Sequence, residues 1–129
     1  MNFTVTLYRS DAAKFDLTSH PDCAALNPKE LLLYSAGLCA CYTLEQNLRR
    51  SHLKPQEFEI SLTGTLSTPT LRAEGYFTHF AIRYWLRVEE SAEQEAAATA
   101  VRKTHDEDCG LLKMLKMIAE VDSEIVVVA

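Results

Sequence analysis

With 129 residues, of which 47% are hydrophobic and 24% charged, the chain has the composition of one ordinary globular domain spanning 1–129. Its formal net charge of −5 provides no basic field that would attract a phosphate backbone, so nucleic acid is not an expected partner. The longest uncharged apolar run, residues 31–43, is shorter than the roughly 17–25 residues that cross a bilayer. It therefore indicates a buried helix, and no membrane partner is expected.

The N-terminal residues alternate between polar and apolar side chains. Phe3, Val5 and Leu7 share one face of a predicted strand, and the alternation returns over 14–18 after a polar break at 10–13. The sequence therefore predicts a hairpin. An export signal would instead be basic and then apolar, so we expect a cytoplasmic protein whose thiols stay reduced.

Asn27 and Pro28 mark the start of a long predicted helix that extends to about Arg50. Proline suits the first helical position, where the missing N–H has no intrahelical partner to lose. Glu30, three residues after Asn27, completes the pattern of a capping box. The first half of the helix is apolar on every side and the second half is polar, so one end is predicted to be buried and the other solvated.

The hydrophobic period predicts five further elements, namely strands over 58–62, 76–88 and 121–128 and helices over 92–105 and 109–118. Ser91 is expected to cap the first of these helices. In the long strand, Phe80, Ile82, Tyr84 and Leu86 share one face and are expected in the core. The order β-β-α-β-β-α-α-β predicts an α+β fold with a largely antiparallel sheet around the long central helix.

Four cysteines occur in the chain, Cys23, Cys39, Cys41 and Cys109. In a reducing compartment we expect free, catalytic or metal-binding thiols rather than a structural disulfide framework. Cys39 and Cys109 lie in separate helical segments, so they could meet in space and exchange electrons. Cys23 and Cys41 are interpreted as small apolar residues of the core, since free cysteine is among the most buried residue types.

The reactive form of cysteine is the thiolate, which depends on the surroundings of each sulfur. Cys109 begins a helix, and the unsatisfied N–H groups there are expected to favour its thiolate. Cys39 lies among apolar residues and needs a nearby cation or polar group, and Arg9, Arg83 and Arg87 are the candidate cations.

The sequence does not indicate a metal site. Cys39 and Cys41 are two positions apart on a helix and so point about 200° apart around its axis. The four histidines have no ligand spacing, and His105 would share a face with Cys109 only if their helix ran unbroken. The acidic residues 106–108 between them are interpreted as a solvated helix end. We expect no metal and no other cofactor.

Two segments resemble the signatures of the OsmC/Ohr family of thiol-dependent hydroperoxide reductases. In the first, Pro28-Lys29-Glu30-Leu31-Leu32 opens a helix and Cys39 follows eleven residues after the proline. In the second, Cys109-Gly110-Leu111-Leu112-Lys113-Met114-Leu115 is followed by Ala119-Glu120-Val121 and the last strand. The Lys-Met-Leu and Ala-Glu-Val portions are most similar to a less characterised OsmC-like branch.

The resemblance implies an intertwined homodimer with the long apolar helix at its centre and two active sites at the subunit interface. It implies that Cys39 attacks an organic or lipid hydroperoxide and becomes a sulfenic acid. Cys109 would then resolve this acid to a disulfide, which an external dithiol reduces. It further implies activating roles for an arginine of the first hairpin, for which Arg9 is the candidate, and for Glu30, whose position the OsmC-like branch retains.

Two positions depart from the family pattern. Lys29 stands where established peroxidases have a glutamate, and Gly110 stands where many members have a proline. Lys29 keeps open a second hypothesis, a redox-sensing or small-ligand-binding module with weak or no peroxidase activity. A third hypothesis is a hot-dog-type thioesterase, whose sheet also wraps around one helix. Against it, the usual order of elements in a hot-dog fold has no second helical region before the last strand.

Overall fold

The fold consists of one sheet and one layer of helices. The computed structural model describes residues 1–10, 14–54 and 57–129, so residues 11–13 of the predicted polar break lie outside the described part. Within it the strands are β1 (Asn2–Arg9), β2 (Phe15–Leu17), β3 (Phe58–Leu66), β4 (Phe77–Arg87) and β5 (Glu120–Val128). The helices are α1 (Pro28–Arg50), α2 (Gln94–Lys103) and α3 (Gly110–Ile118), with shorter turns η1 (Cys23–Ala25), η2 (Ser91–Glu93) and η3 (Thr104–Asp108).

The five strands are arranged in the order β2-β1-β3-β4-β5. Neighbouring strands are antiparallel except β4 and β5, which are parallel, with His79 opposite Glu120 and Arg87 opposite Val128. A parallel pair needs a crossover connection, and the segment containing α2, η3 and α3 supplies it. The predicted hairpin and the α+β fold with a largely antiparallel sheet are therefore confirmed.

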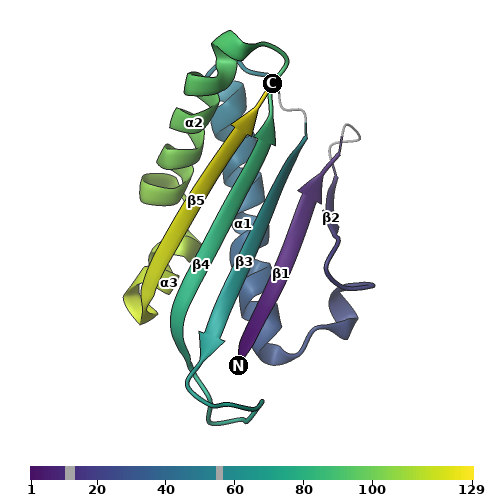
Figure 1. The fold of residues 1–129 in the computed structure, drawn as a ribbon, viewed down its shortest axis with the longest axis vertical. Helices are drawn as coiled ribbons and strands as arrows, with labels where there is room; N and C mark the ends of the chain where they lie inside the picture. The colour runs from purple at the N-terminus through teal and green to yellow at the C-terminus, as the bar shows by residue number, and fades with distance from the viewer. Residues whose placement is uncertain (11–13, 55–56) are drawn as a thin grey trace.

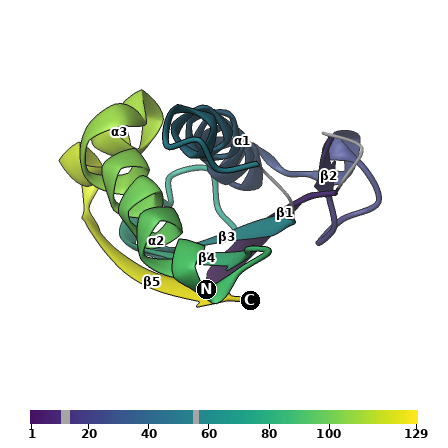
Figure 2. The ribbon, with the colours of Figure 1, turned by 90° about the horizontal axis from the view of Figure 1, so that it is seen from above.

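All three α-helices lie on one face of the sheet, and no helix covers the opposite face in the described part of the chain (Figures 1 and 2). The core fills the space between these two layers. Leu33, Ala40 and Leu44 of α1 and Phe80 and Tyr84 of β4 are all fully buried there. The predicted core face of the long strand is thus confirmed.

The start of α1 has the cap that the sequence predicts. The side chain of Asn27 accepts a hydrogen bond from the N–H of Glu30 at 2.9 Å, and the Glu30 carboxylate accepts one from the N–H of Asn27 at 3.0 Å. These contacts satisfy backbone donors that a helix start leaves unpaired. The predicted range from Pro28 to Arg50 is confirmed as well.

The helix predicted over 92–105 is interrupted at both ends. Its first turn, η2, is a 3₁₀ turn that follows Glu90, whose N–H donates to the Glu93 carboxylate at 3.1 Å. Glu90 and not Ser91 is therefore the cap, because the turn begins one residue earlier than predicted. At the other end, η3 is a π-helical turn, so His105 and Cys109 do not share a regular helix.

The apolar first half of α1 is not buried on every side, contrary to the prediction. Leu31 is 41% exposed, Leu32 39% and Tyr42 61%. A single sheet reaches only the inner face of a helix, so the outer face of α1 keeps these side chains in contact with solvent within one chain.

Candidate functional site

Cys39 and Cys109 meet in the fold. Their sulfur atoms lie 3.3 Å apart, although the two residues are 70 positions apart in the sequence. Cys39 lies in the middle of α1 and is half-buried, whereas Cys109 immediately precedes α3 and is only 1% exposed. The better-buried member of the pair is therefore Cys109, and not Cys39 as its apolar neighbours suggested.

Burial sets the acid strength of Cys109. Loss of water around its sulfur raises the pKa of this thiol to about 11, while hydrogen bonds from the backbone of Leu112 and Leu111 lower it and contact with Cys39 raises it. The N–H groups at the helix start lower the pKa of Cys109, as predicted, but desolvation outweighs them, so the net shift disfavours the thiolate. Cys109 is a thiol at neutral pH and donates its hydrogen to the sulfur of Cys39.

The other two cysteines have different environments. Cys41 is fully buried, as predicted, and burial, followed by the negative charge of Glu45, raises the pKa of its thiol. Cys23 is exposed, so its assignment to the core is wrong. It lies in the short turn η1, before α1 begins, and none of the residues of this turn is buried.

Arg9 is held at the end of β1 by an acidic residue of α1. Its guanidinium lies 2.8 Å from the Glu45 carboxylate and also donates to the backbone carbonyl of Ser10 at 3.2 Å. Arg9 is only 3% exposed. Among the described residues, the Cys39 sulfur accepts its hydrogen bond from Cys109. The structure therefore places no hydrogen bond between the described Arg9 and this sulfur.

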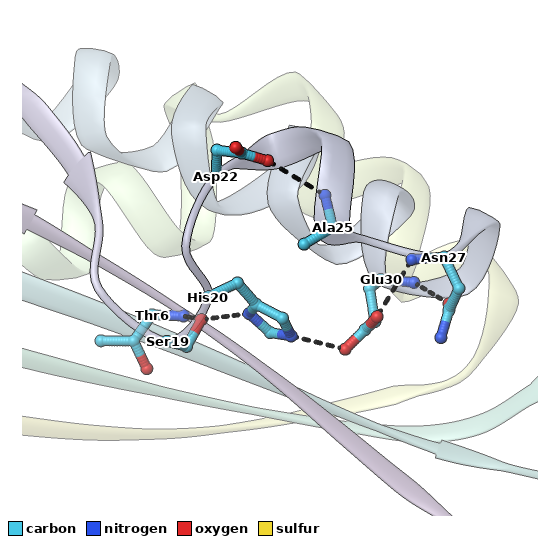
Figure 3. A network of polar contacts seen from close by, with 7 residues as sticks. All are labelled: Thr6, Ser19, His20, Asp22, Ala25, Asn27 and Glu30. Atoms are coloured by element: carbon cyan, nitrogen blue, oxygen red, sulfur yellow. Dashed lines mark hydrogen bonds and ion pairs between the residues drawn. The ribbon is translucent and has the colours of Figure 1, made fainter.

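Glu30 belongs to a network at the start of α1 (Figure 3). Besides the N–H of Asn27, its carboxylate contacts Nε2 of His20 at 2.8 Å. Nδ1 of His20 lies 2.7 Å from the hydroxyl of Ser19, which accepts a hydrogen bond from the N–H of Thr6 at 3.0 Å. Glu30, nine residues before Cys39, thus connects α1 to β1 through Ser19 and His20.

Lys29 points to the loop between β3 and β4. Its ammonium group donates to the backbone carbonyl of Gly75 and to that of Ala73. An open hollow of about 320 Å³ lies beside it, lined by Pro28, Lys29, Leu71, Arg72 and Ala73. Lys29, which departs from the family pattern, therefore holds this surface loop through its hydrogen bonds to the loop backbone.

A cluster of polar side chains around η3 was not predicted as part of the site. Asn47 donates to Thr104 and Asp108, and the hydroxyl of Tyr84 lies 2.8 Å from Nδ1 of His105. Asp108 is therefore more than a solvated helix end. The spacing of His105 and Cys109 pointed to this segment. Its partners, Asn47 of α1 and Tyr84 of β4, are distant in sequence, so no local pattern predicts them.

Two close thiols, one half-exposed, can form a disulfide by two-electron oxidation.

Within residues 1–10, 14–54 and 57–129, no three His, Cys, Asp or Glu side chains are placed to hold a metal ion. Among the helices of this described part, none is long and apolar enough to cross a membrane.

The comparison with known proteins identifies relatives of this fold. No curated protein matches the chain. A hypothetical protein from Aquifex aeolicus VF5 has a similar structure, with 24% sequence identity and a TM-score of 0.65 over 95% of this chain and 93% of that one. An OsmC-like protein from Mycoplasma pneumoniae has 11% identity and a TM-score of 0.67 over 100% and 96%.

A third similar structure is an organic hydroperoxide resistance protein, OsmC, from Legionella pneumophila, with 16% identity and a TM-score of 0.52 over 96% of each chain. At these identities the structures establish the shared fold. The profile of the OsmC-like protein family matches residues 20–124, which is most of the chain and includes both Cys39 and Cys109. The chain therefore belongs to the OsmC-like protein family.

Proposed function

We propose that this protein is a thiol-dependent peroxidase that reduces organic hydroperoxides through Cys39 and Cys109. The observation that carries the proposal is the 3.3 Å separation of the two sulfur atoms. Membership of the OsmC-like family supports it, since a similar structure is that of an organic hydroperoxide resistance protein. Cys39 is the attacking residue because it is the more exposed of the two.

The first step oxidises Cys39. Its thiolate attacks the terminal oxygen of the hydroperoxide, a sulfur–oxygen bond forms and the oxygen–oxygen bond breaks. The leaving alkoxide takes a proton and departs as an alcohol. Cys39 is then a sulfenic acid, and the hydroperoxide has been reduced by two electrons.

The second step closes a disulfide. The sulfur of Cys109 attacks that of Cys39, and the hydroxyl group leaves with the proton of the Cys109 thiol as water. An external dithiol then reduces the disulfide and is itself oxidised to a disulfide. We place this cycle in the cytoplasm, where such dithiols are kept reduced.

The exposed outer face of α1 supports a homodimer as the working form. Leu31, Leu32 and Tyr42 would be buried against a second copy, which would bring the half-exposed Cys39 near the subunit interface. Analytical ultracentrifugation of the protein should show a dimer. A monomer at micromolar concentration would contradict this part of the proposal.

The decisive test is the consumption of cumene hydroperoxide by the reduced protein with dithiothreitol. Cys39→Ser should abolish turnover, and Cys109→Ser should retain oxidation of Cys39 but lose the disulfide. The matched control is Cys23→Ser, because Cys23 is exposed and is not part of the hydrogen-bonded thiol pair, so turnover should be unchanged. Full turnover in Cys39→Ser would rule the mechanism out.

A second candidate is a redox-sensing or small-ligand-binding module with weak or no peroxidase activity. It is favoured by the charged residues, since Arg9 pairs with Glu45, Glu30 with His20, and Lys29 fastens a loop. Among the described residues, none of these contacts is a hydrogen bond to the Cys39 sulfur. If oxidised glutathione forms the Cys39–Cys109 disulfide but hydroperoxides are consumed no faster than by free dithiothreitol, this candidate replaces the first.

A further inference from the structure

The turn that carries Cys109 has an unusual backbone. Residues Thr104–Asp108 form a π-helical turn, and the N–H of Cys109 closes it by donating to the carbonyl of Thr104 at 3.1 Å. π-Helical turns are rare and occur frequently at functional sites, because the extra residue redirects the chain. Here the chain becomes extended at Cys109 before α3 begins at Gly110.

Asn47 of α1 holds both ends of this turn. Its amide nitrogen Nδ2 donates to Oγ1 of Thr104 and to Oδ2 of Asp108, each at 3.0 Å. The hydroxyl of Thr104 in turn donates to the carbonyl of Ala100 at 2.9 Å. One buried amide group thus connects α1 to the first and last residues of the turn.

The other side of the turn is held by two more elements. Nδ1 of His105 lies 2.8 Å from the hydroxyl of Tyr84 on β4. The ammonium group of Lys116 on α3 donates to the carbonyl of His105 at 2.6 Å. The backbone next to Cys109 is therefore fixed from α1, β4 and α3 together.

Asn47 carries a cost that an apolar side chain would avoid. It is only 2% exposed, and its Oδ1 is a buried side-chain polar atom with no hydrogen-bond partner among the described residues. Burying an unpaired acceptor is unfavourable, and a leucine of similar size would leave none. The position therefore depends on the two hydrogen bonds that Nδ2 donates.

We infer that Asn47 is a positioning residue, which holds the π-helical turn so that the sulfur of Cys109 stays within reach of Cys39. Both Cys39 and Asn47 belong to α1, so one rigid helix carries the first thiol and fixes the segment that carries the second. This inference rests on the proposed function, because it concerns the step in which Cys109 attacks the oxidised Cys39.

The test separates the two steps in Asn47→Ala. Oxidation of Cys39 by cumene hydroperoxide, followed in single turnover with a sulfenic-acid trap, should stay within about twofold of the wild type. Closure of the disulfide should slow at least about tenfold, because a displacement on the order of 1 Å can reduce a rate by about 10². A mere loss of stability would not separate the two steps in this way.

Three further variants control the experiment. Asp108→Ala should also slow closure, and it carries the test if Asn47→Ala does not fold, whereas Asp108→Asn keeps an acceptor oxygen and should restore closure. Gln46→Ala, an exposed neighbour on α1, should match the wild type. Wild-type closure rates in both Asn47→Ala and Asp108→Ala would overturn the inference.

Exchange with oxidised glutathione distinguishes this inference from the proposed function. Two thiols and one glutathione disulfide give the Cys39–Cys109 disulfide and two reduced glutathione molecules, with no peroxide involved. The effective concentration of the thiol pair should fall at least about tenfold in Asn47→Ala. If the wild type does not react with hydroperoxide but this difference is found, the peroxidase proposal fails and the positioning role stands.

Discussion

Arg9 and Glu45 form an ion pair that connects the last residue of β1 to the C-terminal half of α1. The contact is 2.8 Å long, and the two side chains are only 4% and 16% exposed. Removing one partner of such a pair leaves a charge in a site with little water, which is more costly than losing a surface ion pair.

Glu45→Gln is therefore expected to lower the free energy of unfolding by about 1.5–3 kcal/mol, the usual range for a hydrogen bond to a charged group. Urea denaturation measures this change. Arg49→Ala is the matched control, because Arg49 contacts the same carboxylate at 3.2 Å but is 61% exposed. Its effect should stay below about 1 kcal/mol. Equal losses in the two variants would contradict the distinction.

His105 should make the stability depend on pH. Burial, and then the charge of Lys116, lower the pKa of His105, while Asp106 raises it. Below about pH 6.5 the unfolded chain gains a proton that the folded chain does not, so the free energy of unfolding falls as the pH drops. His105→Gln should reduce this slope by at most about 1.4 kcal/mol per pH unit. Denaturation at about pH 7.5 and 5.5 measures it, and identical slopes would show that His105 does not titrate in this way.

The four cysteines should react with iodoacetamide in a fixed order. Cys23 is exposed and should be modified first, followed by the half-buried Cys39. Cys41 and Cys109 should be slowest, because both are buried and burial raises the pKa of each thiol. Mass spectrometry after short labelling at neutral pH gives the order, and labelling in urea should make all four equal. Early labelling of Cys109 would contradict its thiol state.

Gly64 of β3 has no room for a side chain. A Cβ atom there would overlap the ring of Phe77. Gly64→Ala should therefore lower the free energy of unfolding by about 1–3 kcal/mol, as overpacked cores do. Combining it with Phe77→Leu should recover part of this loss, which a double-mutant cycle measures.

Gly110 is the matched glycine. A Cβ atom there would meet no atom of the other described residues within 4 Å, and the φ of Gly110 is not positive. Because alanine restricts the unfolded chain, Gly110→Ala should raise the free energy of unfolding by about 0.4–1 kcal/mol. A loss of stability similar to that of Gly64→Ala would show that the start of α3 is constrained in some other way.

Local patterns predicted the parts of the fold that depend on near neighbours. The cap formed by Asn27 and Glu30 and the buried face of β4 follow from spacings of two to four residues. The exposure of Cys23 and the outer face of α1 could not be predicted this way, because burial depends on which elements pack together. The same holds for the acid strength of Cys109, which desolvation determines.

The candidate site shows the same division. Resemblance identified Cys39 and Cys109, and their sulfur atoms are in contact. The partners of Arg9 and of Asp108 could not be predicted, since Glu45 and Asn47 are more than 30 residues from them in sequence. The activating roles of Arg9 and Glu30 stay predictions, and Glu45→Gln tests the contact that holds Arg9.

The crossover from β4 to β5 affects how much a disulfide would stabilise the folded protein. It brings Cys109 next to Cys39, which lies 70 positions earlier, so a bond between the two sulfurs would close a loop of about that length. Cross-linking so long a loop removes chain entropy from the unfolded state, worth about 4 kcal/mol. The form with the Cys39–Cys109 disulfide would then be more stable than the reduced form. Under the proposed cycle, the protein would resist heat and proteolysis best after a peroxide has oxidised its two thiols.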